Sequence, residues 1–129
     1  MSPLLVDSSI YIKHLRDGED VRQLLLPHFH AAMLYNCGVV RAEVIRGIKA
    51  PHARDGMEAF FDIVPEVPCD ARAWRHAAQL GWELGRMGKW PPVTDLMIAV
   101  CAIRVNATVV TLDQHFNGIP NLRVTDQIP

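Results

Sequence analysis

Three aspartates stand at positions from which carboxylates can bind a divalent metal ion: Asp7, Asp95 and Asp113. Asp7 and Asp113 each follow a short apolar segment, and Asp95 precedes the longest apolar run of the chain. No Lys or Arg lies near these three acids in the sequence. Because like charges gathered in one cleft are costly to remove from water, the arrangement favours a hard cation such as Mg²⁺ or Mn²⁺, which can also activate water for attack on phosphorus.

The segments between Asp95 and Asp113 predict that these two carboxylates meet. Residues 96–103 are all apolar and indicate a buried helix over about 95–105, with Thr94 or Asp95 as its N-cap. Residues 108–111 are β-branched throughout and indicate a short buried strand. The helix advances about 17 Å at 1.5 Å per residue, and an antiparallel strand returns about 16 Å. Asp113 is therefore expected beside Asp95.

Apolar segments and helical patterns alternate along the rest of the chain. We predict strands at 4–6, 31–35, 108–111 and 122–124, a short apolar segment at 63–67, and helices at 10–16, 20–28, 39–48, 51–61 and 71–87. Ser8 and Ser9 are candidate N-caps for the first helix, and Asp70 for the last of these. This order predicts an α/β fold with a mostly parallel sheet, in which ligands bind beyond the carboxyl ends of the strands.

Composition is consistent with one domain spanning residues 1–129, with half of the residues hydrophobic and a net charge of −1. The cysteines Cys37, Cys69 and Cys101 show no paired spacing, which favours reduced structural thiols over a disulfide framework or a zinc site. No segment resembles a signal peptide or a membrane span, so a soluble, cytoplasmic protein is expected. Small residues at 77, 78, 81, 85 and 88 allow close helix contact, either inside the fold or across a dimer face.

Each acid also has a purely structural interpretation. Asp95 alone is explained as an N-cap, Asp7 as a turn residue, and Asp113 as part of an Asx-turn. Glu43, one turn into the helix at 39–48, is explained alone as a solvated residue, although its helix follows a strand and points it toward the same edge of the sheet. Taken together, the acids are better explained by a shared metal site.

Four segments carry a resemblance to a known family. They are LLVDSSIYI with Asp7 and Ser9, RAEVIRG with Glu43, TDLMIAVCAI with Asp95, and VVTLDQHF with Thr111 and Asp113. In this order and at these intervals, they resemble the PIN domain, and within it the VapC-type toxins of bacterial toxin–antitoxin pairs. The resemblance spans essentially the whole chain and implies a three-layer α/β/α sandwich with a short, mostly parallel central sheet.

The resemblance also implies an activity. It implies a metal-dependent endoribonuclease in which Asp7, Glu43, Asp95 and Asp113 bind Mg²⁺ or Mn²⁺, with Ser9 and Thr111 supporting the acids. The expected substrate is tRNA, rRNA or mRNA, and the expected partners are a second copy of the chain and a VapB-type antitoxin. Two alternatives stay open at this point: a nuclease of RNA processing or decay without a toxin role, and a non-catalytic domain that binds RNA or protein.

Positive charge for RNA has two candidate sources in the sequence. Basic residues gather around Glu43 and along the helix at 71–87: Arg41, Arg46, Lys49, His52 and Arg54 in the first group, and Arg72, Arg75, Arg86 and Lys89 in the second. Trp90 and His115 are further candidates for substrate contact, although packing is the favoured explanation for Trp90 and simple exposure for His115.

Overall fold

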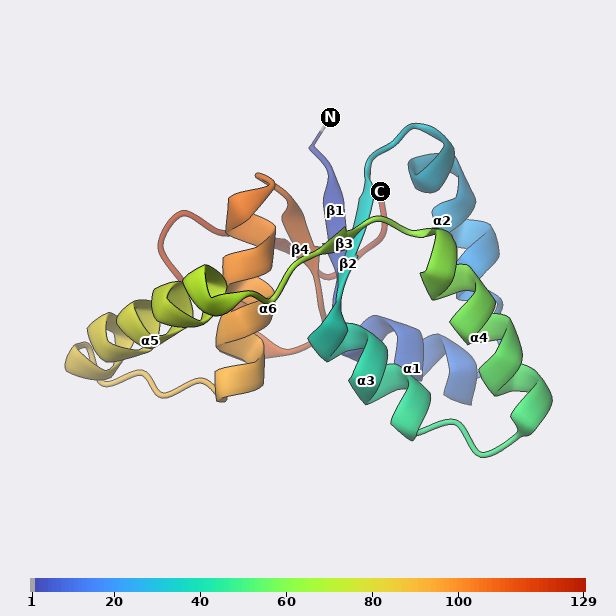
Figure 1. Ribbon diagram of the computed structural model, residues 1–129, viewed down its shortest axis with the longest axis horizontal. Helices are drawn as coiled ribbons and strands as arrows, with labels where there is room; N and C mark the ends of the chain where they lie inside the picture. Colours follow the sequence, from blue (N-terminus) through green and yellow to red (C-terminus); the bar gives the residue numbers. More distant parts are fainter. Residues whose placement is uncertain (1) are drawn as a thin grey trace.

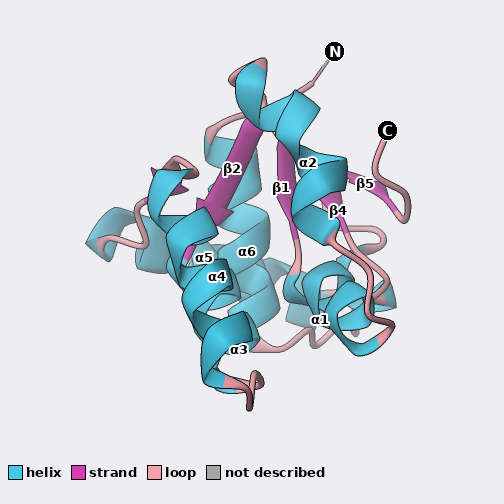
Figure 2. Cartoon of the chain, turned by 90° about the vertical axis from the view of Figure 1, so that its right-hand side faces the viewer, coloured by secondary structure: helices cyan, strands magenta, loops and turns pink. Residues whose placement is uncertain are grey.

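A parallel sheet of five strands forms the centre of the computed structural model, which describes residues 2–129. Its strands are β1 (Leu4–Val6), β2 (Leu34–Cys37), β3 (Glu66–Val67), β4 (Thr108–Val110) and β5 (Arg123–Thr125). Their order across the sheet is β3-β2-β1-β4-β5, and every neighbouring pair is parallel. Four of them follow one another across the view in Figure 2. The predicted α/β class with a parallel sheet is confirmed.

Helices cover both faces of this sheet. They are α1 (Ser8–Arg16), α2 (Val21–His30), α3 (Gly38–Arg46), α4 (Pro51–Ile63), α5 (Ala71–Arg86) and α6 (Val93–Arg104), followed by the 3₁₀ turn η1 (Gln114–Phe116). Figure 1 views the sheet nearly edge-on, with α5 and α6 on one side and α2 and α4 on the other. The three-layer arrangement is therefore as predicted. Among residues 2–129, no helix combines the length and apolar character that a membrane crossing requires.

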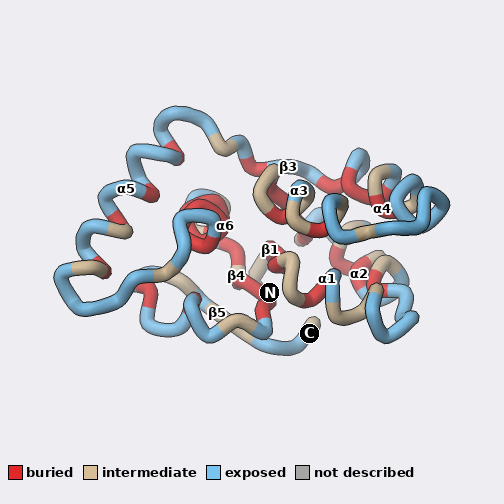
Figure 3. The backbone as a smooth tube through the Cα atoms, turned by 90° about the horizontal axis from the view of Figure 1, so that it is seen from below, coloured by how far each residue is buried: buried red, intermediate tan, exposed pale blue. Residues whose placement is uncertain are grey.

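Helix α6 is the most deeply buried helix. Its residues from Asp95 through Ala102 are all buried, as expected from the unbroken apolar run, and its tube is largely red in Figure 3. Helix α5 packs on its outer side and buries a single stripe that includes Ala77, Leu80 and Leu84. A Cβ added at Gly81 would lie 2.9 Å from Leu96 Cδ1 of α6. The small residue at 81 therefore serves internal packing, which is one of the two predicted uses of this stripe.

Two predicted helix caps are wrong, and both corrections concern the candidate site. Helix α1 begins at Ser8 with Asp7 at the N-cap position, so Ser8 and Ser9 lie in the first turn instead of before it. Helix α6 begins at Val93 with Pro92 at its N-cap, so Asp95 lies inside the first turn. Asp95 therefore does not cap its helix, and its side chain is available for other contacts. The predicted cap at Asp70 is confirmed, since its carboxylate accepts from the N–H of Ala73 at 2.9 Å.

The second strand begins later than predicted. Helix α2 continues through Pro27 to His30, and Ala32 has a positive φ of 56° in the turn that follows. This turn is closed by the N–H of Met33, which donates to the carbonyl of His28 at 2.8 Å. The strand consequently covers Leu34–Cys37 instead of 31–35, and it ends directly before α3.

Candidate metal centre at the carboxyl ends of the strands

The candidate acids converge because β1 and β4 are parallel neighbours. Val6 pairs with Val110 in the register, so the chain leaves both strands at the same edge of the sheet. Asp7 follows β1 directly, and Asp113 lies three residues beyond β4. Helix α6 begins at the end of the molecule at which β1 stops, as Figure 1 shows, and this brings Asp95 to the same edge. We refer to Asp7, Glu43, Asp95 and Asp113 as the acidic rim.

Two hydroxyl groups fix the carboxylate of Asp7, which is only 2% exposed. Ser9 Oγ and Thr111 Oγ1 each donate to Asp7 Oδ2 at 2.7 Å. The backbone N–H of Leu112 donates to Ser9 Oγ at 3.1 Å, and that of Asp113 donates to Thr111 Oγ1 at 2.9 Å. Each hydroxyl thus accepts from the backbone and gives its proton to the acid. Ser9 and Thr111 thus both contact Asp7 directly.

Asp95 and Asp113 share a histidine between them. Nδ1 of His115 lies 3.0 Å from Asp95 Oδ2 and 3.0 Å from Asp113 Oδ1. Asp113 also accepts from the backbone N–H of His115 at 2.9 Å, which is the expected Asx-turn. Asp95 and Asp113 are therefore adjacent, as the lengths of the intervening helix and strand predict. Sequence reasoning left open that His115 was simply exposed; its position two residues after an Asx-turn acid is the signal that could have placed it here.

The shifted pKa values at this edge reflect the crowding of negative charge. Burial, followed by the charges of Asp113 and Asp7, raises the pKa of Asp95, while the hydrogen bond from His115 opposes that rise. The hydrogen bond to Asp95 and the charges of both neighbouring carboxylates raise the pKa of His115. The protein therefore gathers carboxylates at a position where a cation is favoured.

Glu43 joins the rim through Ser8. The hydroxyl of Ser8 donates to Glu43 Oε1 at 3.1 Å and lies 3.5 Å from Asp7 Oδ1. Glu43 is on α3, which begins immediately after β2, so its helix starts at the same edge of the sheet. Sequence reasoning treated Ser8 only as a helix cap and missed this bridge.

The donor set fits a hard divalent ion. Four carboxylates supply oxygen ligands of the kind that Mg²⁺ and Mn²⁺ prefer, and among residues 2–129 no Lys or Arg forms an ion pair with any of the four. One ligand atom each from Asp95, Asp113 and His115 lies within 4.8 Å of the others. Arg41, close to Glu43 in sequence, instead pairs with Glu58 at 2.9 Å and Asp62 at 2.7 Å on α4. Arg41 is therefore engaged in holding α3 to α4.

A hollow of about 430 Å³ borders the rim on the β5 side, and its lining includes Thr111, Asp113 and Asp126. This hollow gives a ligand access to the rim from solvent. A larger hollow, of about 640 Å³, lies between the α1–α2 turn and α4, and none of the four acids lines it. The acidic rim and this larger hollow are thus at different places.

Solved structures share the whole fold of this chain. VapBC from Salmonella typhimurium, bound to DNA, matches with a TM-score of 0.79 and 24% identity, covering 97% of this chain and 98% of that chain. VapBC2 from Rickettsia felis, bound to a promoter DNA fragment, matches with a TM-score of 0.77 and 24% identity over 95% and 96%. FitAcB from Neisseria gonorrhoeae matches with a TM-score of 0.68 and 15% identity over 95% and 96%.

No curated protein matches the sequence. The family model described as the PIN domain, however, matches residues 4–122, which include all four rim acids together with Ser9 and Thr111. The parallel sheet, the helices on its two faces and this match agree with one another. The chain belongs to the PIN domain family.

Proposed function

We propose that this protein is a metal-dependent endoribonuclease that acts as the toxin of a VapBC-type toxin–antitoxin pair. The observation that carries the proposal is the carboxylate of Asp7, held by two hydroxyl groups at 2.7 Å at the edge where α6 brings in Asp95. A buried acid fixed in this way, beside other acids, is a ligand prepared for a cation rather than a solvated surface group.

Asp7, Glu43, Asp95 and Asp113 would hold Mg²⁺ or Mn²⁺. Such an ion would polarise an oxygen of the phosphodiester and make a bound water more acidic. The residues of the chain orient that chemistry: Ser9 and Thr111 fix Asp7, and Ser8 links Glu43 to it. Nδ1 of His115 can hold a proton between Asp95 and Asp113 when no cation is bound.

An RNA substrate needs positive charge near the acids to hold its phosphates. Nζ of Lys89 lies against Gly118, shortly after η1, and so on the side of the rim that carries Asp113 and His115. Arg86 instead stacks over the ring of Trp82, with 4.8 Å between its guanidinium carbon and the ring centre. Of these two residues, Lys89 is therefore better placed for phosphate contact. The substrate class that we propose is tRNA, rRNA or mRNA.

The toxin role is supported by the fold that the chain shares with the VapBC structures from Salmonella typhimurium and Rickettsia felis. The proposed partners are a VapB-type antitoxin and a second copy of the chain, in the cytoplasm. Large apolar side chains exposed on α5 and after it provide apolar area for such contacts: Trp74, Trp82, Met87, Trp90 and Val93. Co-purification of the chain with the product of an adjacent reading frame, and loss of RNA cleavage in that complex, would test this part.

The nuclease activity is tested with purified protein and cellular RNA in the presence of Mg²⁺ or Mn²⁺. We expect cleavage that EDTA abolishes and that Asp7→Asn and Asp95→Asn each reduce on the order of 100-fold or more, because each removes a charged ligand. Asp55→Asn is the matched control, since Asp55 is an exposed acid on α4. It should cleave like the unchanged protein.

Addition of Mn²⁺ should also raise the melting temperature of the unchanged protein and of Asp55→Asn, but not that of Asp7→Asn, because only a site on the folded state stabilises it. Cleavage that persists in EDTA or in Asp95→Asn would refute the mechanism. A melting temperature that does not respond to Mn²⁺, together with absent cleavage, would favour the non-catalytic alternative.

A further inference from the structure

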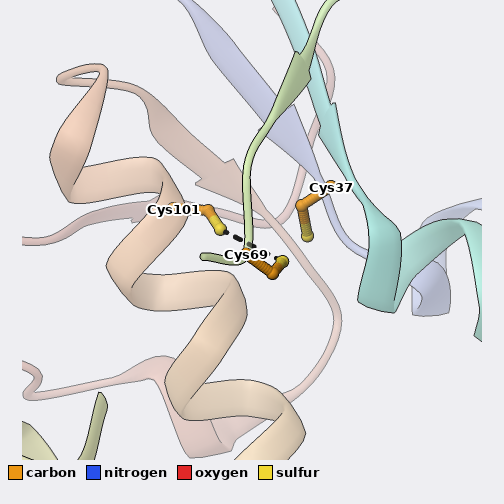
Figure 4. A group of neighbouring side chains, drawn as sticks. All are labelled: Cys37, Cys69 and Cys101. Atoms are coloured by element: carbon orange, nitrogen blue, oxygen red, sulfur yellow. Dashed lines mark hydrogen bonds between the residues drawn. The ribbon is translucent and has the colours of Figure 1, made fainter. Parts of the chain in front are cut away.

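Three cysteines that are far apart in the sequence lie together in the fold. Cys37 is the last residue of β2, Cys69 lies between β3 and α5, and Cys101 is in α6. Their sulfur atoms all lie within 4.8 Å of one another, and the Sγ atoms of Cys69 and Cys101 are 3.8 Å apart. Figure 4 shows the three side chains converging from these segments. All three are free thiols.

The spacing of the sulfur atoms suits a metal ion. Three atoms no more than 4.8 Å apart leave a point within about 2.8 Å of each, and a Zn–S bond is about 2.3 Å long. Three sulfur atoms bound at that length in a trigonal arrangement are separated by about 4.0 Å, close to the 3.8 Å between Cys69 and Cys101. Shifts of about half an ångström would therefore close the site around an ion.

The donor set selects the kind of ion. Sulfur supplies every ligand atom of this group, and the thioether sulfur of Met97 lies 3.8 Å from Cys101 Sγ. Thiolate and thioether ligands favour soft or borderline ions over Mg²⁺ and Ca²⁺. We propose that Cys37, Cys69 and Cys101 form a second metal site, which binds a thiophilic d¹⁰ cation, Zn²⁺ or Cu⁺, and is separate from the acidic rim.

Binding has to release protons from the three thiols. The neighbouring thiol of Cys101, together with burial, raises the pKa of Cys37 to about 12, while the hydrogen bond with Cys69 and, to a smaller extent, the backbone N–H of Val40 oppose this rise. For zinc, the hydrated Zn²⁺ exchanges its waters for three thiolates, three protons go to solvent, and the complex carries one negative charge. The N-terminus of α3 lies at Cys37, and its dipole favours that charge.

The segment that carries Cys69 is held in place and still gives access to solvent. Arg104 of α6 donates to the carbonyl of Pro68 at 2.9 Å and to the carboxylate of Asp70 at 3.1 Å, on either side of Cys69. Cys37 and Cys101 are fully buried, whereas Cys69 is only partly buried. An ion would therefore enter beside Cys69.

The site would tie together two helices that carry rim acids. Cys37 is the N-cap residue of α3, which holds Glu43, and Cys101 is on α6, which holds Asp95. A bound ion would thus resist separation of α3 from α6 and stabilise the folded state. The inference rests on the thiols alone and does not depend on the proposed nuclease activity.

The test uses the whole protein, reduced with a reductant that does not bind metals and kept free of oxygen. Zn²⁺ and Cu⁺ are titrated separately against a chromogenic chelator, and Cd²⁺ is added as a spectroscopic probe, because sulfur-to-cadmium charge-transfer absorption reports sulfur ligands only. We expect one equivalent of Zn²⁺ or Cu⁺ to bind and the melting temperature to rise. Cys69→Ser should weaken binding by about 100-fold or more and lower the cadmium absorption of the bound complex, because only two thiolates remain.

Two further variants separate this site from others. Asp95→Asn should keep the cadmium absorption, since the acidic rim contributes no sulfur. If circular dichroism shows that the serine variant does not fold, Cys69→Ala serves as a second test of the same ligand. Of Zn²⁺ and Cu⁺, the ion that binds more tightly is the one for which the cysteine site is suited. Failure of both Zn²⁺ and Cu⁺ to bind the unchanged protein, or equal binding by a folded Cys69 variant, would overturn the proposal and leave the cysteines as core packing.

Discussion

Replacement of Thr111 by valine tests whether the hydroxyl groups hold Asp7. Thr111 is 3% exposed, so Thr111→Val keeps the shape of a buried side chain and removes only its hydroxyl. Three hydrogen bonds are lost: the one to Asp7 Oδ2 at 2.7 Å, the one from the N–H of Asp113 at 2.9 Å, and a longer one with Ser9 Oγ at 3.3 Å. A hydrogen bond to a charged group contributes about 1.5–3 kcal/mol and the half-solvated backbone bond about 1 kcal/mol, so we expect a loss of about 2.5–4 kcal/mol in the free energy of unfolding.

The measurement is urea unfolding of the metal-free protein, with Thr108→Val as the control. Thr108 is on β4, and its hydroxyl accepts a single, exposed hydrogen bond from Arg123 Nε at 3.3 Å. The control should lose about 0.5 kcal/mol or less. Thr111→Val should also weaken the stabilisation by Mn²⁺, because Asp7 would no longer be held in place.

A double-mutant cycle with Asp7→Asn isolates the contact itself. In that background the hydroxyl meets a neutral partner, so Thr111→Val should cost only about 2 kcal/mol more than Asp7→Asn alone, about 1 kcal/mol for each of the two neutral hydrogen bonds. If Thr111→Val costs no more than Thr108→Val, or costs the same with and without Asp7→Asn, the hydroxyl of Thr111 does not hold the acid and this part of the reasoning is refuted.

Three further predictions follow from other side chains. The hydroxyl of Tyr11 is buried with no partner among residues 2–129, so Tyr11→Phe should raise stability by about 1 kcal/mol; a lower melting temperature would reveal a missed hydrogen bond. Phe61 is 2% exposed and packs edge-on to Tyr11, with 5.2 Å between the ring centres. Phe61→Ala should therefore lower the free energy of unfolding by about 3–5 kcal/mol, as measured by urea unfolding. The pKa of His115 is raised in the folded state, chiefly by Asp95. The stabilisation of the folded protein by protonated His115 is therefore complete below about pH 6.5 and is lost as the pH rises through the folded pKa. The metal-free melting temperature should thus fall as the pH rises above about 6.5, and His115→Gln should flatten that fall; an unchanged slope would contradict the contact.

The sequence predicts those parts of the site that depend on chain length and burial. The meeting of Asp95 and Asp113 followed from one helix and one strand of similar length, and both elements are apolar enough to be recognised. The caps were less predictable. Ser8 and Ser9 are good capping residues in isolation, but the helix begins earlier, with Asp7 at the N-cap position and no side-chain capping hydrogen bond, and the two serine hydroxyls bind side chains instead.

Contacts between segments that are distant in the chain left no signal in the sequence. Cys69 and Cys101 are brought together by the packing of α6 against the segment after β3, which no local pattern encodes. The limits of β2 were missed for a related reason. Helix α2 continues past Pro27, although proline lacks the N–H of a helical hydrogen bond, and the following strand therefore starts three residues later than predicted.

The two outer strands of the sheet affect how the protein behaves at high concentration. Strand β3 is only two residues long and β5 only three, so the outer strands expose few unpaired backbone groups. Arg123 of β5 also folds back, and its guanidinium donates to the carbonyl of Asn106 at 2.6 Å. Short and charged outer strands discourage strand-by-strand addition of another molecule. The protein is thus expected to resist fibril-like aggregation when it accumulates.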